Sequence, residues 1–180
     1  MTRYNTPAIV LHWLMALMII GLFGLGLYMH ELPFSLQKLK LYSWHKWAGV
    51  TVFVLALLRL YWRHRNPPPT LSAMPAWQQM AAHYGHSELY LLMLIVPLSG
   101  WLMSSAKGIQ TVWFGLIPLP DLLEKNEQTG DLLAATHKYL NFTFMFIVIG
   151  HFGAALQHHL IHKDDTLKRM APWLNRPRTI

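Results

Sequence analysis

The sequence predicts an all-α membrane protein, a bundle of four transmembrane helices with both termini on the cytoplasmic side. Of its 180 residues, 53% are hydrophobic and only 13% are charged, about half of the ~25% charge usual in soluble globular domains. Long stretches carry no charged side chain, and the chain has no cysteine. This composition excludes disorder and argues against a soluble enzyme. The missing thiols exclude disulfides, thiolate metal sites and covalently attached haem.

Three of the four spans follow directly from uncharged runs. Crossing the hydrocarbon core takes ~20 mostly apolar residues. The first run, between Arg3 and Glu31, is 27 residues long, and the runs 89–106 and 139–162 hold 18 and 24 residues. Each of these runs is therefore long enough, with its flanking residues, to form a membrane-spanning helix.

The second span is less obvious because its uncharged run, 47–58, has only 12 residues. It reaches membrane length when Lys46 and Arg59 at its ends extend their charged groups toward water. We therefore expect a single domain over 1–180, with spans at about 8–29, 43–62, 84–105 and 137–160.

Basic residues distribute unevenly between the two sides that these spans define. All seven arginines fall on the side of the termini and the 63–83 connection. Nine basic residues lie there: Arg3, Arg59, Arg63, Arg65, Lys163, Lys168, Arg169, Arg176 and Arg178. The other side has six lysines against five acidic residues. Because basic residues favour the cytoplasmic side, the net charge of +7 is interpreted as a topology signal, and no nucleic-acid partner is expected.

Histidines within the spans are the candidate functional residues, because ionisable side chains at membrane depth are costly. His137 and His151 are fourteen residues apart, which brings both side chains to one helix face, ~21 Å apart along the axis. Each needs a partner at matching depth on another helix. His45 lies at the outer level and His12 at the inner level, so the spacing predicts two pairs, His45 with His137 and His12 with His151.

Two bis-histidine pairs inside a four-helix bundle are what two stacked haem groups require, since imidazole is an axial ligand of haem iron. Zinc is the competing metal, but its sites gather three or four ligands around one ion. Histidines ~21 Å apart on one helix cannot share an ion. His86 is the alternative partner of His151, because it also starts at the inner face. The uninterrupted helix around His12 favours His12.

Four further residues near the predicted inner pair are candidates for binding a quinone or handling its protons: His83, His86, His158 and Glu88. Quinone reduction consumes two protons, and an imidazole that titrates near neutral pH suits their delivery. Solvation at the membrane interface is the alternative interpretation of these residues.

The pattern resembles the bacterial cytochrome b561 family, di-haem membrane proteins related to the cytochrome b subunits of hydrogenases. The resemblance covers nearly the whole chain. It rests on the segments His12-Trp13-Leu14, Ala82-His83-Tyr84-Gly85-His86 and Lys163-Asp164-Asp165-Thr166-Leu167, with His45, His137, His151, His158 and His159 between them. It implies four spans in the bacterial inner membrane and two b-type haems. The implied ligand pairs match His12 with His151 and His45 with His137.

One branch of that family oxidises superoxide at the outer face and passes the electrons to ubiquinone. The resemblance therefore implies superoxide:quinone oxidoreductase activity, with electrons crossing two haems. Five outer lysines are candidates for attracting the anion: Lys38, Lys40, Lys46, Lys107 and Lys138. Acidic residues in the same outer region leave its net charge close to neutral, which weakens this steering.

Two other functions remain open from the sequence. The chain is alternatively a cytochrome b membrane anchor for a periplasmic redox enzyme, with a docking surface that includes Trp113 and Phe114. A more distant alternative is a histidine-lined metal or proton transporter without haem. The redox step belongs to the haem in both electron-transfer hypotheses, so axial histidines alone do not distinguish an enzyme from a conduit.

Overall fold

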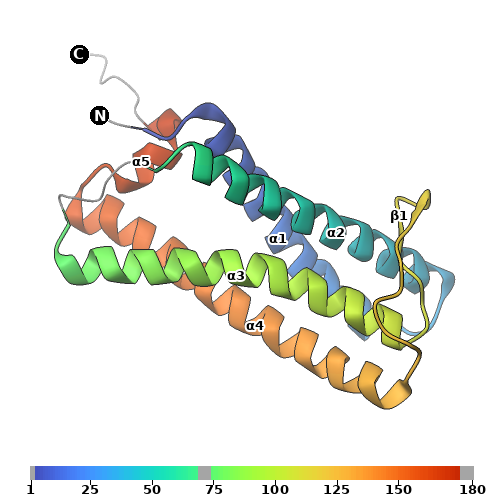
Figure 1. The fold of residues 1–180 in the computed structure, drawn as a ribbon. Helices are drawn as coiled ribbons and strands as arrows, with labels where there is room; N and C mark the ends of the chain where they lie inside the picture. Colours follow the sequence, from blue (N-terminus) through green and yellow to red (C-terminus); the bar gives the residue numbers. More distant parts are fainter. Residues whose placement is uncertain (1–2, 69–73, 175–180) are drawn as a thin grey trace.

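The computed structural model describes residues 3–68 and 74–174, and four long helices dominate it (Figure 1). They are α1 (Thr6–Glu31), α2 (Leu36–Arg65), α3 (Ala76–Ala106) and α4 (Glu127–Gln157). A small antiparallel hairpin, β1 (Val112–Trp113) with β2 (Ile117–Pro118), lies at the outer end. At the inner end α4 continues into a π-helical turn (His158–His162), followed by α5 (Thr166–Met170) and a 3-10 turn (Pro172–Leu174).

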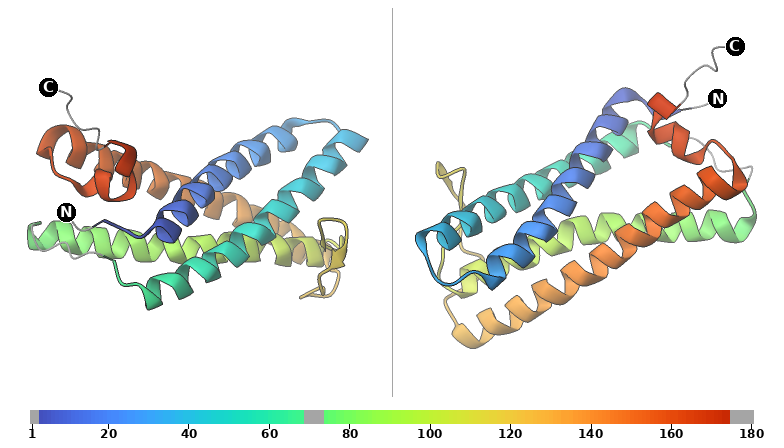
Figure 2. Two further views of the ribbon diagram at one scale, coloured as in Figure 1. Left: turned by 90° about the horizontal axis from the view of Figure 1, so that it is seen from above. Right: turned by 180° about the vertical axis from the view of Figure 1, so that it is seen from behind.

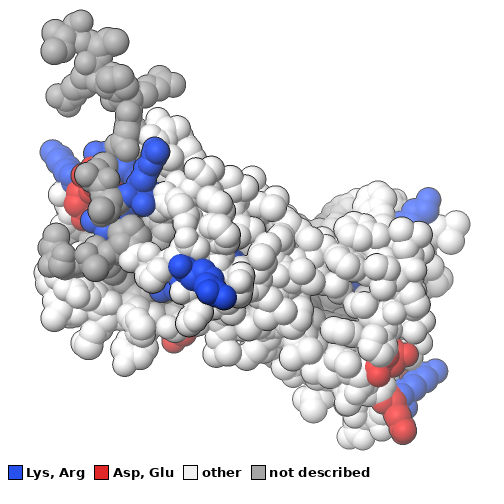
Figure 3. Space-filling model, turned by 45° about the horizontal axis from the view of Figure 1, so that its top comes forward, with Lys and Arg blue, Asp and Glu red and all other residues white. Residues whose placement is uncertain are grey.

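All four long helices are long and apolar enough to span a membrane, which confirms the predicted all-α class. The surface agrees with membrane-spanning helices. In Figure 3 charged side chains gather toward the two ends of the molecule and leave a largely uncharged region between them. Arg176 and Arg178, which entered the orientation argument, lie outside the described residues. The cytoplasmic placement of the termini remains a prediction.

α2 and α4 both begin before the predicted spans, and each begins at a side-chain cap. Ser35 caps α2, its hydroxyl accepting a hydrogen bond from the Lys38 backbone N–H at 3.2 Å. Asn126 caps α4 in the same way, accepting from the Thr129 N–H at 2.9 Å. Hydropathy shows which part of a helix is apolar enough to lie in the membrane. A cap satisfies the free N–H groups of the first turn and so marks where the helix begins, inside or outside the membrane.

The four helices do not pack equally around a centre. α3 packs along both α4 and α2, and α2 packs along α1, but α1 and α4 make little contact. They diverge toward the end that holds the chain termini (Figure 2). The buried core is small and consists of Met15, Val52, Ala56, Leu92, Met93, Val96 and Phe144. Phe144 lies seven residues from both His137 and His151, on the same helix face, so this core separates the two histidine levels.

Hydrogen bonds close the inner end of the bundle. Asn5 caps α1 with its Oδ1 atom, which accepts from the Ala8 N–H at 3.1 Å and from Trp62 Nε1 of α2 at 3.0 Å. Its Nδ2 atom donates to Asn66 Oδ1 at 3.2 Å. Trp13 Nε1 donates to the backbone oxygen of Met170 at 2.8 Å. The start of α1 is thereby joined both to the end of α2 and to α5.

The Asn5→Ala substitution should destabilise the protein by about 2 kcal/mol, since it removes a helix cap and two inter-helix hydrogen bonds. Asn126→Ala is the matched control, because it removes a cap alone and should cost about 1 kcal/mol. Thermal unfolding of both variants in detergent measures the difference. Equal losses of stability would contradict the joining role of Asn5.

Candidate functional site

The outer histidines meet inside the bundle. The ring centroids of His45, on α2, and His137, on α4, lie 6.4 Å apart with their planes at 84°. Two imidazoles that face each other across one metal ion, each bonded at ~2.0 Å, place their ring centroids about 6 Å apart. The pair therefore has the separation of two axial ligands on opposite sides of one ion.

Hydrogen bonds orient the His137 ring. Its Nδ1 atom lies 3.1 Å from the backbone oxygen of Val96 and 2.8 Å from the Ser99 hydroxyl. A carbonyl oxygen only accepts, so Nδ1 carries the proton and Nε2 keeps a free lone pair. This is the arrangement in which a histidine binds a metal through Nε2. Gly100 makes room for the ring, because a Cβ there would lie 3.0 Å from the His137 Cε1 atom.

Three histidines lie together at the inner level. The ring centroid of His151 is 6.2 Å from that of His12, on α1, and 5.4 Å from that of His86, on α3. Only the first separation equals that expected for two axial ligands of one ion. Arg59 Nη2 donates to His12 Nδ1 at 2.9 Å, which leaves the ring proton on Nε2 because a guanidinium cannot accept.

A cavity of about 640 Å³ surrounds the inner histidines. Its walls are mostly apolar, and α1 and α4 line it on the side where they diverge. Arg59 and Arg63 contribute positive charge, and Arg63 also lies over the Tyr90 ring at 5.3 Å. α5 covers the inner end through Thr166, Leu167, Arg169 and Met170. A mainly apolar pocket with a few convergent polar groups is typical of a cofactor or small-molecule site.

The cavity includes only some of the residues predicted to serve a quinone. His86 and His158 line it, whereas His83 and Glu88 are exposed and do not. The His83 ring instead contacts Tyr84, with the two centroids 5.8 Å apart. The exposed His83 and Glu88 side chains therefore lie away from the part of α3 on which His86 and Leu89 line the cavity.

The five outer lysines differ in the hydrogen bonds and ion pairs that their side chains form. Lys38 Nζ donates to the backbone oxygen of Leu32 at 2.6 Å, and Lys46 Nζ donates to that of Ile109 at 3.2 Å. Lys107 pairs with Asp131. Lys40 and Lys138 are exposed, and within the described residues they form no hydrogen bond or ion pair.

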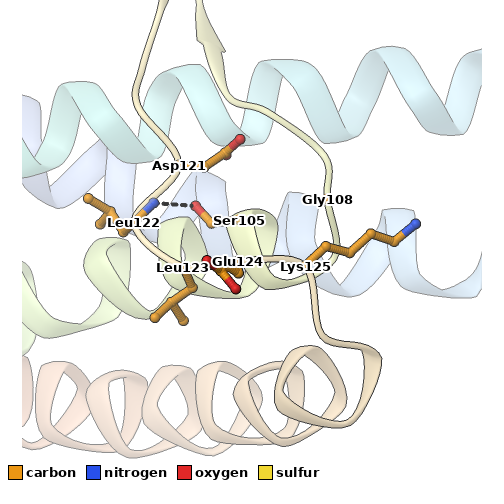
Figure 4. Close-up of a pocket in the computed structure, with 7 residues that line it drawn as sticks. All are labelled: Ser105, Gly108, Asp121, Leu122, Leu123, Glu124 and Lys125. Atoms are coloured by element: carbon orange, nitrogen blue, oxygen red, sulfur yellow. Dashed lines mark hydrogen bonds between the residues drawn. The ribbon is translucent and has the colours of Figure 1, made fainter.

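A second pocket, of about 400 Å³, lies at the outer end between α3 and the segment that leads into α4 (Figure 4). Leu122 donates its backbone N–H to the Ser105 hydroxyl there at 3.1 Å. The pocket is open to solvent, and its lining contains none of the predicted site residues. The inner cavity is therefore the stronger candidate site.

Sequence reasoning missed two of the residues that shape the histidine pairs, Arg59 as a partner of His12 and Ser99 as a partner of His137. Arg59 had a recognisable signal, because a charged residue within a span normally has a partner inside the bundle. Ser99 had none, since hydroxyls in membrane helices commonly bond to their own backbone.

An apolar four-helix bundle that encloses facing pairs of histidines has the architecture of a histidine-ligated membrane cytochrome. The comparison with protein families agrees, because residues 3–173 match the model of the prokaryotic cytochrome b561 family. The chain belongs to this family. Its function is accordingly electron transfer in the membrane, its cofactor is b-type haem, and it is a multi-pass protein of the bacterial inner membrane.

Three relatives match the chain over nearly its whole length. Cytochrome b561 homolog 2 of Escherichia coli is 35% identical over 170 residues, which cover 93% of this chain and 90% of that protein. Cytochrome b561 homolog 1 of the same organism is 32% identical over 182 residues, 96% of this chain and 98% of that protein. A protein of Yersinia pestis named probable superoxide oxidase CybB is 32% identical over 172 residues, 94% of this chain and 96% of that protein.

Replacing Ser99 by Ala should weaken haem binding at the outer pair by about tenfold and raise the reduction potential of that haem, because His137 loses a partner that strengthens it as a ligand. Ser87→Ala is the control, since the only bond of the Ser87 hydroxyl among the described residues is to its own helix, at the His83 oxygen. Haem retention and a spectroscopic redox titration measure both effects. Identical potentials in the two variants would contradict a role for Ser99.

Proposed function

We propose that this chain conducts electrons across the inner membrane through two b-type haems, from a donor at the outer face to a quinone at the inner face. Superoxide is the favoured donor, so the chain is a superoxide:quinone oxidoreductase. The observation that carries the proposal is the occurrence of two histidine pairs, with ring centroids 6.4 Å and 6.2 Å apart, at two depths of one bundle.

The donor set fits haem iron at the outer level. His45 and His137 are both largely buried, and the Nδ1–H of His137 is engaged by Val96 and Ser99. His45 Nδ1 is buried without a partner in the described structure. A metal bound through Nε2 would leave the Nδ1–H of His45 without an acceptor, so this atom is no argument for the metal. The fit rests on the hydrogen-bonded ring of His137 and on the 6.4 Å separation of the two rings.

At the inner level we assign His12 and His151 as the ligand pair. The 6.2 Å separation of their rings suits a metal between them, while the 5.4 Å separation of His86 and His151 is short for that purpose. Binding through His12 Nε2 requires the Nδ1 contact with Arg59 to open. Arg59 then becomes available to an acidic group of the cofactor, and His86 is left to serve the quinone.

When bound, each haem supplies an iron centre that accepts and releases one electron. His137 and His151, on one face of α4 with Phe144 between them, would each hold one of the two centres. Its apolar core keeps water away from this interval. Two superoxide ions lose one electron each and leave as dioxygen, while one quinone takes up two electrons and two protons.

Two features support superoxide as the donor. A relative that is 32% identical is named a probable superoxide oxidase, and exposed lysines at the outer face are suited to attract a small anion. Of the five candidates, Lys40 and Lys138 are exposed, and within the described residues their ammonium groups form no hydrogen bond or ion pair. We therefore expect these two to contribute most to steering.

The anchor hypothesis remains the second candidate because of the outer hairpin. The side chains of Phe114, Leu116 and Ile117 are 55%, 81% and 52% exposed, and the hairpin is held against α2 by a 3.2 Å hydrogen bond from Trp113 Nε1 to Thr51 Oγ1. A firmly held apolar tip is suited to dock a periplasmic redox protein. Co-purification of a redox enzyme that loses its membrane attachment on Leu116→Asp would favour this function.

The haem content of the purified protein tests the ligand assignment. We expect two b haems per chain in the reduced-minus-oxidised spectrum, and one in each of the variants His45→Ala and His12→Ala. His86→Ala should keep both. Loss of a haem from His86→Ala but not from His12→Ala would reverse the inner assignment, and a wild-type protein that binds no haem would contradict electron transfer altogether.

Superoxide-driven quinone reduction tests the donor. The double variant Lys40→Gln/Lys138→Gln should lower the second-order rate constant for superoxide by about tenfold at low salt, because the anion is no longer attracted to the outer face. Raising the ionic strength should abolish the difference between this variant and the wild type. Lys163→Gln, at the inner end, should have no effect. A wild-type protein that superoxide does not reduce would favour the anchor function.

A further inference from the structure

The turn that follows α4 holds an ion pair at the edge of the inner cavity. His158 Nδ1 lies 2.6 Å from Asp164 Oδ2, and His158 also lines the cavity. Its side chain is only 15% exposed, whereas that of Asp164 is 37% exposed. The pair thus extends from the cavity to the water at the inner face.

The backbone holds Asp164 in place. Lys163 adopts a left-handed conformation with φ of 53°, which turns the chain back so that the Asp164 N–H donates to the His158 oxygen at 3.1 Å. The other carboxylate oxygen of Asp164 accepts from the Thr166 N–H at 2.8 Å. The carboxylate is therefore fixed on one side by α5 and presents Oδ2 to the imidazole.

The electrostatics favour an ionised carboxylate. Burial alone would raise the pKa of Asp164, but hydrogen bonds from Thr166 and from His158 outweigh it and lower the pKa below its usual range. The turn itself also contains His159 and Lys163. His162 lies with its ring centroid 5.1 Å from that of His158, and Arg169 of α5 lines the same cavity. Asp165 forms an ion pair with Lys168, in which Nζ lies 2.9 Å from Oδ1.

We infer that Asp164 is a positioning residue that holds His158 as the proton donor to a quinone in the inner cavity. This inference rests on the proposed quinone-reducing function. With Nδ1–H bonded to Asp164, the ring leaves Nε2–H as the donor available to the cavity. A carboxylate in this position orients the imidazole and stabilises its protonated form.

The proton balance is simple. The His158 imidazolium transfers its Nε2 proton to a quinone oxygen as the quinone receives electrons, and the ring becomes a neutral imidazole that keeps Nδ1–H on Asp164. A proton from inner-side water then restores the imidazolium. Two such transfers, with two electrons, convert one quinone into one quinol.

The test uses pre-reduced holoprotein mixed with a short-chain ubiquinone, with haem reoxidation followed by stopped flow. We expect Asp164→Asn to retain its haem and to be reduced by dithionite like the wild type, but to reoxidise at least tenfold more slowly. Its rate should also begin to fall at lower pH than that of the wild type, because the imidazolium has lost a stabilising charge. Asp165→Asn, one residue away, should behave like the wild type.

Equal reoxidation rates and equal pH profiles in Asp164→Asn and Asp165→Asn would overturn the inference. If Asp164→Asn failed to hold haem, Asp164→Glu would decide, since it keeps the charge but displaces the carboxylate. Slower reoxidation with normal haem content would then support the positioning role, and wild-type reoxidation would overturn it. A wild-type holoprotein that is not reoxidised by the quinone contradicts the proposed function itself and not merely the role of Asp164.

Discussion

An imidazole placed in the apolar interior of a membrane bundle must find a partner there, and this requirement organises the molecule. α4 carries two such groups, fourteen residues apart on one face, so the bundle must supply a partner at each of two depths. α2 supplies His45 and α1 supplies His12, and both of their rings lie within 6.4 Å of the α4 rings. The neighbouring helices are thus arranged around the histidines of α4.

The unequal packing of the helices follows from the same requirement. α1 and α4 contact each other little and instead face across the inner cavity. The apolar core is confined to the level between the two pairs, with Phe144 near its centre. A bundle packed tightly along its whole length would leave no room for a cofactor at either level, since protein interiors contain few voids larger than water.

The two ends of the bundle differ in how they meet water. At the outer end a hairpin is bound to α2 through Trp113, and the exposed Lys40 and Lys138 lie near the starts of α2 and α4. At the inner end α5 covers the cavity, and the His158–Asp164 pair connects it to the surface. This asymmetry suits a protein that receives electrons from a small donor on one side and supplies protons to a larger acceptor on the other.

The sequence by itself determined the class of the fold and the depth of each histidine, because both depend on distance along the chain. Uncharged runs mark the spans. The geometry of an α-helix gives the distance between His137 and His151 along the axis and places both on one face. Hydropathy does not detect the caps Ser35 and Asn126, at which α2 and α4 begin, and it does not show that His83 and Glu88 lie outside the cavity lining. Only the tertiary structure decided that the His151 ring lies 6.2 Å from that of His12 and 5.4 Å from that of His86. It also decided that Arg59, Ser99 and Asp164 bond to histidines. Some of those contacts join residues distant in sequence, and the one to Asp164 follows a chain reversal. They depend on how each helix is rotated about its own axis, which the sequence does not show.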